Sequence, residues 1–315
     1  MKILFVSSGK KGTINPIIRN QGESLRRAGV EVDFYMVFGR GIKGYLRNIK
    51  PLREQIKLGK YDVIHAHYAF CAYLAGLALT GLHTPMVVSL MGSDIWERKW
   101  YPFVVRMAAR LNSWRAVIVK SQEMRSRVGM PQAIVVPNGV DMERFKELDR
   151  KECQTQLGWK CQNKHVLFPA DPSTARKNWP LAESAVARLN ALGKCTIELH
   201  GMIGVKNEDT PIMYNAADAV VLPSFYEGSA NAVKEAMACN EPIVTTDMGD
   251  CRERIEGVEG CYVANTYEVE EFAELLKEAL LYGKKTKGRD RLVADGIADY
   301  QIAERLIKIY QCMMK

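Results

Sequence analysis

The sequence predicts an α/β protein with two domains, each built around a doubly wound parallel sheet. Three observations lead to this prediction. The chain has 315 residues, which is about the length of two average domains. Short aliphatic or β-branched runs alternate with longer amphipathic runs, which is typical of βαβ units. A polar stretch at 150–164 separates two series of such runs and is predicted to connect the domains.

About seven strands are predicted in the first series. The clearest are Ile3–Val6, Val32–Val37, Val63–Ala66, Met86–Leu90, Val117–Val119 and Ile134–Val136. Most are short, largely apolar runs of the kind that is buried in a parallel sheet. Between the first two, the apolar spacing predicts a helix over Ile17–Ala28 that is closed by Gly29.

Five strands are predicted in the second series: His165–Phe168, Thr196–Leu199, Ala219–Leu222, Ile243–Thr245 and Cys261–Val263. Helices are predicted between them, notably over Leu181–Leu192 and Ala230–Ala238. The final stretch, Ile297–Met314, is a predicted helix with no strand after it. We therefore expect an N-terminal domain over 1–155, a C-terminal domain over 156–296, and a terminal helix over 297–315 that packs back toward the N-terminal domain. Ligands of open parallel sheets bind beyond the carboxyl ends of the strands.

Composition narrows the classes of function. Hydrophobic residues make up 47% of the chain and charged residues 25%, as in ordinary globular proteins. No apolar run approaches the ~20 residues of a membrane-spanning helix, and the first residues favour a strand over a signal peptide. The eight cysteines include no C-x-x-C pair, so neither a zinc site nor a disulfide framework is predicted. A cytoplasmic location is expected.

The net charge of +8 is unevenly distributed. Residues 1–150 hold a large basic excess and residues 151–315 a small acidic one, so the first half should attract an anionic ligand or surface. Basic residues recur every three or four positions in the segment 40–60, at Arg40, Lys43, Arg47, Lys50, Arg53, Lys57 and Lys60. As one helix, this segment would have a basic face and an apolar stripe. It could pack within its domain, or lie peripherally on an anionic membrane.

The loop after the predicted strand Ala219–Leu222 leads into a helix. Ser229 is the predicted N-cap of that helix, and Gly228 allows close approach of a ligand to the backbone. Unpaired amides at a helix start form a site for phosphate. Glu227 and Glu235 lie just before and just inside the helix, so two carboxylates could flank one polar ligand and accept hydrogen bonds from sugar hydroxyls. On spacing alone, both could equally be solvated side chains.

The wider pattern reads Pro223-Ser224-x-x-Glu227-Gly228-x6-Glu235-Ala236-Met237-Ala238, followed by Pro242-Ile243-Val244-Thr245-Thr246-Asp247-x-Gly249. It resembles the E-x7-E signature of family 4 retaining glycosyltransferases. Two earlier segments, Asp62-Val63-Ile64-His65-Ala66-His67 and Val136-Pro137-Asn138-Gly139-Val140-Asp141, resemble further parts of the family in the expected order. The resemblance implies a GT-B fold, in which two Rossmann-like domains face a central cleft.

The resemblance also implies the activity: transfer of a sugar, with retained anomeric configuration, from a nucleoside-diphosphate sugar to a hydroxyl. The acceptor would be a saccharide or a lipid-linked molecule in the synthesis of cell-surface polysaccharide or another glycan. No cofactor is expected, because the nucleotide sugar is a substrate. No Asp-x-Asp motif occurs in a suitable loop, so no metal ligand is predicted for the reaction. The protein could associate peripherally with the inner face of the membrane.

The donor residues are implied position by position. Glu227 would contact the donor sugar and Glu235 the ribose, with further donor contacts from Gly228, Ser229 and Ala230. Lys177 matches the family lysine that binds the donor diphosphate. Asp171 stands near the position of the expected arginine, so Arg176 is predicted to replace it. Met202 is expected beside the nucleobase. Glu227, Lys177 and Arg176 are the predicted catalytic residues.

The acceptor side departs further from the family pattern. The glycine-rich segment Ser8–Thr13 is predicted to link the first strand to a helix, and it is neither a P-loop nor G-x-G-x-x-G. Gly12 would face the donor, and Lys10 and Lys11 would reach an anionic acceptor. Met91 replaces the usual histidine beside the donor sugar, and a thioether cannot transfer a proton.

Asp94 and His67 are predicted to bind the acceptor, although His67 could instead belong to the core. Three other functions stay open: a nucleotide-sugar epimerase of the same fold, a non-catalytic subunit that binds sugar nucleotide or glycan, and a nucleic-acid-binding protein. The last is not expected, because no recognisable motif supports it.

Overall fold

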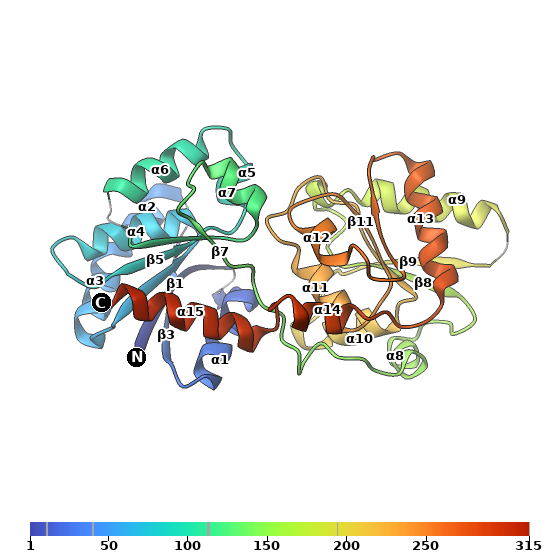
Figure 1. Cartoon of the computed structure of the whole chain (residues 1–315), viewed down its shortest axis with the longest axis horizontal. Helices are drawn as coiled ribbons and strands as arrows, with labels where there is room; N and C mark the ends of the chain where they lie inside the picture. Colours follow the sequence, from blue (N-terminus) through green and yellow to red (C-terminus); the bar gives the residue numbers. More distant parts are fainter. Residues whose placement is uncertain (11, 40, 112–113, 194, 315) are drawn as a thin grey trace. The chain divides into compact units, whose positions relative to one another are not determined.

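The computed structural model describes residues 1–10, 12–39, 41–111, 114–193 and 195–314. They form two compact units (Figure 1). Unit 1 comprises Met1–Gly139 and Asp299–Lys315, and unit 2 comprises Val140–Ala298. The predicted boundary at 155 is therefore wrong, because the chain enters unit 2 at residue 140.

The predicted polar connector is the reason for this error. Its first part is the helix α8 (Arg150–Leu157), which belongs to unit 2. Asp149 caps this helix by accepting a hydrogen bond from the Glu152 amide at 2.9 Å, and Gly158 ends it with a φ of 71°. The buried side chains of Cys153 and Gln154 face the unit. The segment has a polar sequence because the rest of the helix is solvated.

Among the described residues, the sheet of unit 1 has seven strands, and all neighbours are parallel except the β1–β2 pair. Their order is β2-β1-β4-β5-β6-β7, with β3 also paired to β1. The strands are β1 (Lys2–Lys10), β2 (Thr13–Ile14), β3 (Glu31–Val37), β4 (Val63–His67), β5 (Met86–Ser89), β6 (Ala116–Val119) and β7 (Ile134–Val135).

Helices cover both faces of this sheet. Along β1, Leu4 and Val6 face one core, whereas Ile3 and Phe5 face the other, as the two-residue period of a strand requires. The first core includes side chains of α3, α4 and α7, and the second includes side chains of α1 and α15. Figure 1 shows α15 beside α1. The helices are α1 (Pro16–Arg27), α2 (Gly41–Leu46), α3 (Ile49–Gly59), α4 (Ala69–Leu79), α5 (Ser93–Trp96), α6 (Tyr101–Leu111), α7 (Gln122–Val128) and α15 (Asp299–Met313).

The segment after the first strand is a hairpin rather than a strand-to-helix loop, so that prediction is wrong. Strand β1 continues to Lys10 and pairs antiparallel with β2, with Gly9 opposite Ile14. A Cβ at Gly9 would lie 2.6 Å from the Thr13 carbonyl oxygen, so only glycine permits this pairing. Gly12 in the turn has a φ of 79°, a conformation that favours glycine.

The basic segment 40–60 is not one helix. It forms α2 and α3, and Asn48 lies between them. Pro51 has no amide hydrogen and its ring clashes with the preceding turn, so a continuous helix through this point is disfavoured. The Asn48 side chain donates to the Gly44 and Phe38 carbonyl oxygens at 2.7 and 2.8 Å and fixes the break. Arg40 lies outside the described residues.

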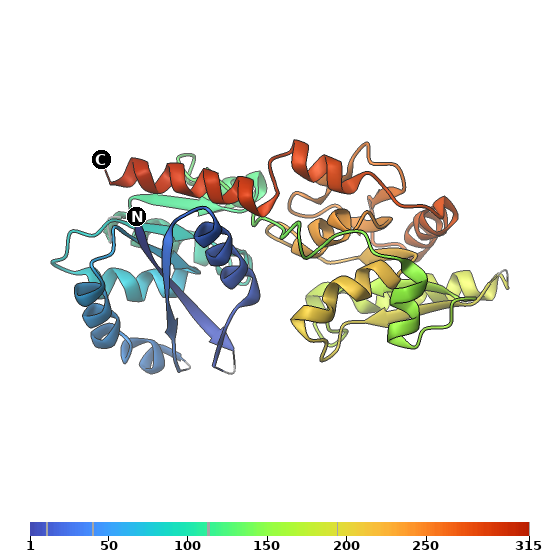
Figure 2. The ribbon, with the colours of Figure 1, turned by 90° about the horizontal axis from the view of Figure 1, so that it is seen from below.

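Unit 2 contains a parallel sheet that, among the described residues, has five strands in the order β12-β11-β10-β8-β9. Helices α9 and α13 contribute to the core on one face, and α10, α11, α12 and α14 contribute to the core on the other (Figures 1 and 2). The strands are β8 (Lys164–Phe168), β9 (Ile197–Gly201), β10 (Ala219–Leu222), β11 (Ile243–Thr246) and β12 (Cys261–Ala264). The helices after α8 are η1 (Ala175–Lys177), α9 (Trp179–Ala191), η2 (Asn207–Asp209), α10 (Thr210–Ala216), α11 (Asn231–Ala238), α12 (Cys251–Ile255), α13 (Val269–Tyr282) and α14 (Gly288–Ala294).

In unit 2, the loops beyond the carboxyl ends of the strands carry most of the predicted site residues. None of the helices in the described part of the chain is long and apolar enough to cross a membrane.

Candidate functional site

Three predicted donor residues of unit 2 meet in one cluster. Arg176 and Lys177 lie on η1, in the loop after β8, and Glu227 lies in the loop after β10. The Arg176 guanidinium contacts Glu227 Oε1 at 2.6 Å, and the Lys177 ammonium contacts the same oxygen. The Phe225 amide also donates to the Arg176 carbonyl oxygen at 2.9 Å, so the two loops are joined through their backbones.

This cluster concentrates positive charge at one point. The side chains of Lys177 and Glu227 are each 13% exposed, and that of Arg176 is 39% exposed. Two cations therefore share one carboxylate in a partly dehydrated place, where charge interactions are stronger than in water. An anion with several oxygens could contact both cations, since arginine binds phosphate in a bidentate manner and lysine acts as a point charge.

Gly249 supports the loop that carries Glu227. It has a φ of 59°, and a Cβ on it would lie 2.9 Å from the Glu227 carbonyl oxygen and 3.1 Å from that of Gly228. Any larger residue at 249 would push this loop away. Gly249 therefore fixes the backbone position of the buried Gly228.

The Ser229 side chain does not cap α11, which corrects the prediction. The N-cap position is Ala230, which makes no side-chain cap hydrogen bond. The Ser229 hydroxyl instead donates to Asp250 Oδ2 at 2.9 Å and accepts a hydrogen bond from the Lys234 ammonium at 3.1 Å. These side chains are all buried, and burial lowers the pKa of Lys234 to about 8. Ser229 therefore fixes the loop through buried hydrogen bonds. The start of α11 has no side-chain cap that would compete with an anion for the backbone amides.

Glu235 lies on α11 and is partly buried. Its Oε2 accepts a hydrogen bond from the Tyr214 hydroxyl at 2.8 Å. Burial raises the pKa of the Glu235 carboxyl, and the Tyr214 hydrogen bond opposes that shift. Tyr214 is a fully buried residue of α10 that the sequence analysis did not select. No local motif points to it, because its partner lies 21 residues further along the chain.

Met202 follows β9 and is partly buried. Its amide donates to the Ala170 carbonyl oxygen at 3.0 Å, which joins the loop after β9 to the loop after β8. Its predicted place beside a nucleobase stays a prediction.

In unit 1, the two histidines of β4 are core residues. His65 shares hydrogen bonds with the Tyr310 hydroxyl at 2.6 Å and the Ser89 hydroxyl at 2.8 Å. His67 is 1% exposed, and its ring lies 4.5 Å from that of Phe5 and 4.2 Å from that of His65, centroid to centroid. Burial lowers the pKa of both imidazoles, so they are neutral. This packing favours the core role of His67 over acceptor binding.

Asp94 is also buried, at 1% exposure. Its carboxylate accepts hydrogen bonds from the amides of Ala69 and Met91, each at 3.0 Å, and of Gly92 at 2.8 Å. Burial raises the pKa of this carboxyl to about 6, although these amides oppose the shift. Asp94 therefore organises the backbone at the starts of α4 and α5, which argues against a direct contact with an acceptor hydroxyl. Met91 is partly buried beside it.

The remaining predicted residues lie at the β1–β2 hairpin. Gly12 is exposed in the turn. The side chain of Lys10 and the whole of Lys11 lie outside the described residues, so their contacts with an anionic acceptor stay predictions.

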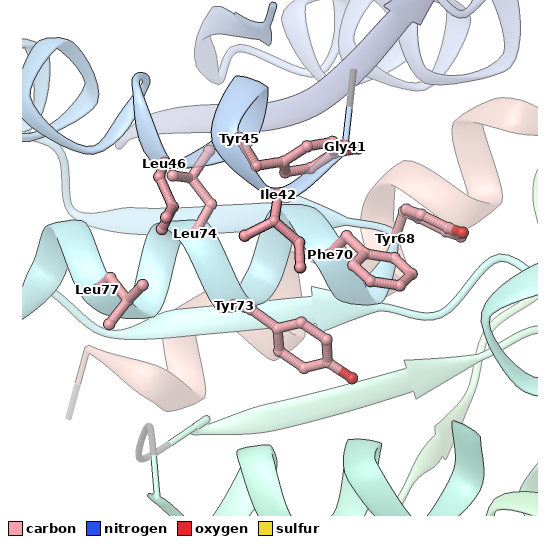
Figure 3. A pocket seen from close by; sticks show the side chains of 9 residues that line it. All are labelled: Gly41, Ile42, Tyr45, Leu46, Tyr68, Phe70, Tyr73, Leu74 and Leu77. Carbon is pink, nitrogen blue, oxygen red and sulfur yellow. The ribbon is translucent and has the colours of Figure 1, made fainter. Parts of the chain in front are cut away.

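Unit 1 also has an apolar groove between α2 and α4 that no sequence motif indicated. It has a volume of about 490 Å³, and Figure 3 shows the side chains that line it. Several are exposed: Ile42 at 80%, Leu46 at 49%, Leu77 at 48% and Phe70 at 36%. Helix α4 is apolar almost all round, so its sequence does not reveal which of its side chains stay uncovered. The lining residues are Gly41, Ile42, Tyr45, Leu46, Tyr68, Phe70, Tyr73, Leu74 and Leu77.

Exposed cations lie on the same helices as the groove. Lys43 and Arg47 belong to α2 or follow it directly, and Lys50 and Lys57 belong to α3. None of the ion pairs that the described residues form involves these four side chains. Arg53 differs, because it donates to the carbonyl oxygens of Ala78 and Thr80 at 2.8 and 2.6 Å.

Two α/β units, each with a parallel or mostly parallel sheet, are typical of the GT-B class of fold, and comparison with solved structures assigns the chain to it. Sucrose-phosphate synthase from Thermosynechococcus elongatus matches with a TM-score of 0.76 at 17% identity, over 98% of both chains. HepE from Anabaena, in complex with UDP and glucose, matches with a TM-score of 0.77 at 17% identity, over 99% of this chain and 100% of HepE.

Sequence comparison identifies the family. Residues 17–144 match Glycosyltransferase Family 4, and residues 177–281 match Glycosyl transferases group 1. The chain therefore belongs to the family 4, group 1 glycosyltransferases.

Curated relatives agree with this assignment. The putative teichuronic acid biosynthesis glycosyltransferase TuaC of Bacillus subtilis is 27% identical over an alignment of 252 residues that covers 71% of this chain and 64% of TuaC. The D-inositol 3-phosphate glycosyltransferase of Paenarthrobacter aurescens is 24% identical over an alignment of 278 residues that covers 74% of this chain and 67% of the relative. The alignment thus spans about two thirds of the length of these relatives.

Proposed function

We propose that this chain is a retaining glycosyltransferase that transfers a sugar from a nucleoside-diphosphate sugar to a hydroxyl during polysaccharide or glycan synthesis. The observation that carries the proposal is the cluster of Arg176, Lys177 and Glu227, which lies beyond the carboxyl ends of β8 and β10. Open parallel sheets bind their ligands at such a place. The family and the curated relatives support transfer of a sugar.

Each group of the cluster has a role in this proposal. Lys177 and Arg176 neutralise the donor diphosphate, and the uncapped start of α11 adds amides and the positive end of the helix dipole. The negative charge that develops on the leaving diphosphate is thereby stabilised by preorganised groups, with no metal ion. When the donor binds, Arg176 and Lys177 contact the diphosphate instead of Glu227, and Glu227 accepts hydrogen bonds from sugar hydroxyls. Glu235 accepts a hydrogen bond from the ribose.

The proposed front-face route needs no enzymic nucleophile. The acceptor hydroxyl attacks the anomeric carbon as the bond to the diphosphate breaks. The departing phosphate oxygen takes the hydroxyl proton on the same face of the sugar, so the configuration is retained. The neutral, buried imidazoles of His65 and His67 are not used in this route.

A nucleotide-sugar screen tests the donor. HepE has been crystallised with UDP and with UDP-glucose, so UDP-sugars are tried first, followed by GDP- and ADP-sugars. A donor present at a hundred times its Kd should raise the free energy of unfolding by about 2.7 kcal/mol. The measurement is a thermal shift, followed by detection of nucleoside diphosphate when acceptor is present.

Three outcomes of this screen would contradict the proposal. Stabilisation by none of these nucleotide sugars would argue against a donor site. Conversion of the sugar nucleotide to an isomer, without release of nucleoside diphosphate, would identify an epimerase. Binding without turnover of any sugar acceptor, together with full function of Glu227→Ala in cells, would identify a non-catalytic subunit.

We also propose that unit 1 holds its acceptor at an anionic membrane through the groove between α2 and α4. An apolar groove next to unpaired exposed cations fits an amphiphile with a hydrocarbon chain and an anionic head group. Its volume of about 490 Å³ and its hydrocarbon lining suit part of a lipid chain. Each lysine or arginine close to an anionic surface contributes about 1 kcal/mol of attraction. The proposed occupant is a hydrocarbon chain of an anionic membrane lipid.

Vesicle binding tests this second proposal. We expect the chain to sediment with phosphatidylglycerol vesicles and not with phosphatidylcholine vesicles, and to dissociate at high salt. Ile42→Glu should abolish binding, because it places a carboxylate in the groove. Lys50→Glu should weaken binding at least about fivefold, the factor that 1 kcal/mol represents.

The matched control is Ile203→Glu, since Ile203 is a comparably exposed isoleucine of unit 2, at 68%. Equal losses for Ile42→Glu and Ile203→Glu, or equal binding to both kinds of vesicle, would contradict the proposed contact.

A further inference from the structure

A cluster of two histidines and a glutamate lies on neighbouring strands of unit 2. His165 belongs to β8, and Glu198 and His200 belong to β9. In the parallel register, His165 is paired with Glu198 and Leu167 with His200, so the three side chains lie on one face of the sheet. One ligand atom from each lies within 4.8 Å of the others.

The hydrogen bonds direct one ligand atom of each group to a common region. His165 Nε2 lies 3.0 Å from the Lys160 carbonyl oxygen. A carbonyl oxygen only accepts, so Nε2 carries the hydrogen and Nδ1 has the lone pair. His165 Nδ1 lies 2.9 Å from His200 Nε2, so it accepts a hydrogen bond from that nitrogen in the absence of an ion. The side-chain amide of Asn163 donates to Glu198 Oε1. The other carboxylate oxygen, Oε2, lies 4.0 Å from His165 Nδ1 and 3.8 Å from His200 Nε2.

The surroundings also resemble those of a metal site. The ring of Trp159 stacks on that of His200 at 3.7 Å and 11° and holds the imidazole in place. The side chains of His200 and Glu198 are 18% and 34% exposed, so an ion can reach the cluster from solvent.

We propose that His165, His200 and Glu198 bind a divalent transition-metal ion of the Zn²⁺ type. In a tetrahedral zinc site with bonds of about 2.0–2.1 Å, two ligand atoms lie roughly 3.3 Å apart. The three distances, 2.9, 3.8 and 4.0 Å, reach this value with shifts of about half an ångström or less on each side chain. When the ion binds, the His200 proton moves from Nε2 to Nδ1 by exchange with water, which frees the Nε2 lone pair for the ion. Water completes the fourth position.

The outer contacts are those that metal ligands usually have. A ligating histidine normally donates its other ring nitrogen to a carbonyl or carboxylate, and ligating carboxylates are held by further hydrogen bonds. The Lys160 carbonyl and the Asn163 amide provide these contacts here. His165 lies three residues before the end of β8, about 10 Å along the strand, and Arg176 and Lys177 follow that end. We assign the ion a structural role, because it fastens the edge strand β9 to β8.

Metal titration of the full, tag-free chain tests the site. The protein is stripped with a chelator and titrated with Co²⁺, whose visible absorption reports tetrahedral coordination, and with Zn²⁺ in competition with a chromophoric chelator. We expect one ion per chain at this site and a Zn²⁺-dependent rise in Tm. His200→Ala and Glu198→Gln should each abolish the cobalt spectrum. Asn163→Ala should weaken binding about ten- to a hundredfold.

Cys161→Ser and His83→Ala are the matched controls, and both should bind like the natural chain. Cys161 is an exposed thiol near the cluster in sequence, so a thiolate-to-cobalt band that it removes would assign binding to that thiol and overturn the proposal. Absence of cobalt binding, or unchanged binding by Glu198→Gln, would also overturn it. Folding of each variant is checked by thermal unfolding without metal. If His200→Ala does not fold, Glu198→Gln decides, because its partly exposed side chain tolerates the change.

Discussion

Replacing Lys177 with alanine is expected to lower the rate of sugar transfer by about 100- to 1000-fold, the usual cost of removing one preorganised group that stabilises developing charge. The Lys177 ammonium is mostly buried and contacts Glu227. Its loss leaves Arg176 as the remaining side-chain cation that pairs with this carboxylate among the described residues. The measurement is kcat and KM with the donor found by the nucleotide-sugar screen.

Binding of donor fragments separates an electrostatic role from a structural one. Lys177→Ala should weaken binding of the nucleoside diphosphate and leave binding of the nucleoside unchanged, because the nucleoside has no phosphate. The matched control is Arg188→Ala, since Arg188 is a half-exposed cation of the same unit that pairs with Glu270. Transfer rates of Lys177→Ala within about twofold of the natural enzyme, or equal losses for both ligands, would refute the assignment of Lys177 to the diphosphate.

The sheets were predictable because their signals are local. In unit 2, β10 and β11 are short aliphatic or β-branched runs that are buried throughout, and such runs are recognised without knowledge of their partners. Glu227 and Glu235 lie in one loop and in the helix that directly follows it. Their spacing can therefore be read from the sequence, and the two residues are identified together. The prediction that Lys177 and Arg176 lie near Glu227 rested on the family resemblance, and the structure brings all three to one point.

The errors come from interactions that the local pattern does not contain. Charge periodicity predicted one helix over 40–60, but Pro51 and the Asn48 hydrogen bonds divide it. Ser229 has the right residue type for an N-cap, yet its hydroxyl bonds to Asp250, which lies 21 residues further along the chain. His165 and His200 meet only through the parallel register of β8 and β9, which no short motif specifies.

Replacing Glu241 with alanine is expected to lower the free energy of unfolding by about 3–5 kcal/mol, the usual cost of breaking a buried ion pair from one side. The Glu241 side chain is fully buried. It contacts Arg150 of α8 at 3.1 Å and also Lys285. Without it, Lys285 loses its carboxylate partner among the described residues, and Arg150 keeps Asp218 at 3.3 Å. Urea unfolding at pH 8, above the pKa of about 7 of this carboxyl, measures the effect. Glu270→Ala breaks an exposed pair instead, and should change stability by at most about 1 kcal/mol.

The dependence on pH shows whether burial or charge pairing dominates at Glu241. Burial raises the pKa of this carboxyl from its usual 4.5 to about 7, although Lys285 and Arg150 oppose the shift. Between these values the native state holds a proton that the unfolded chain has released, so this group's contribution to stability falls as pH rises. Glutamine does not titrate, so Glu241→Gln lacks this contribution to the pH dependence. The stability of the natural chain relative to Glu241→Gln should therefore decrease from pH 4.5 to pH 7. A constant or rising difference would show that the two cations keep the carboxylate ionised.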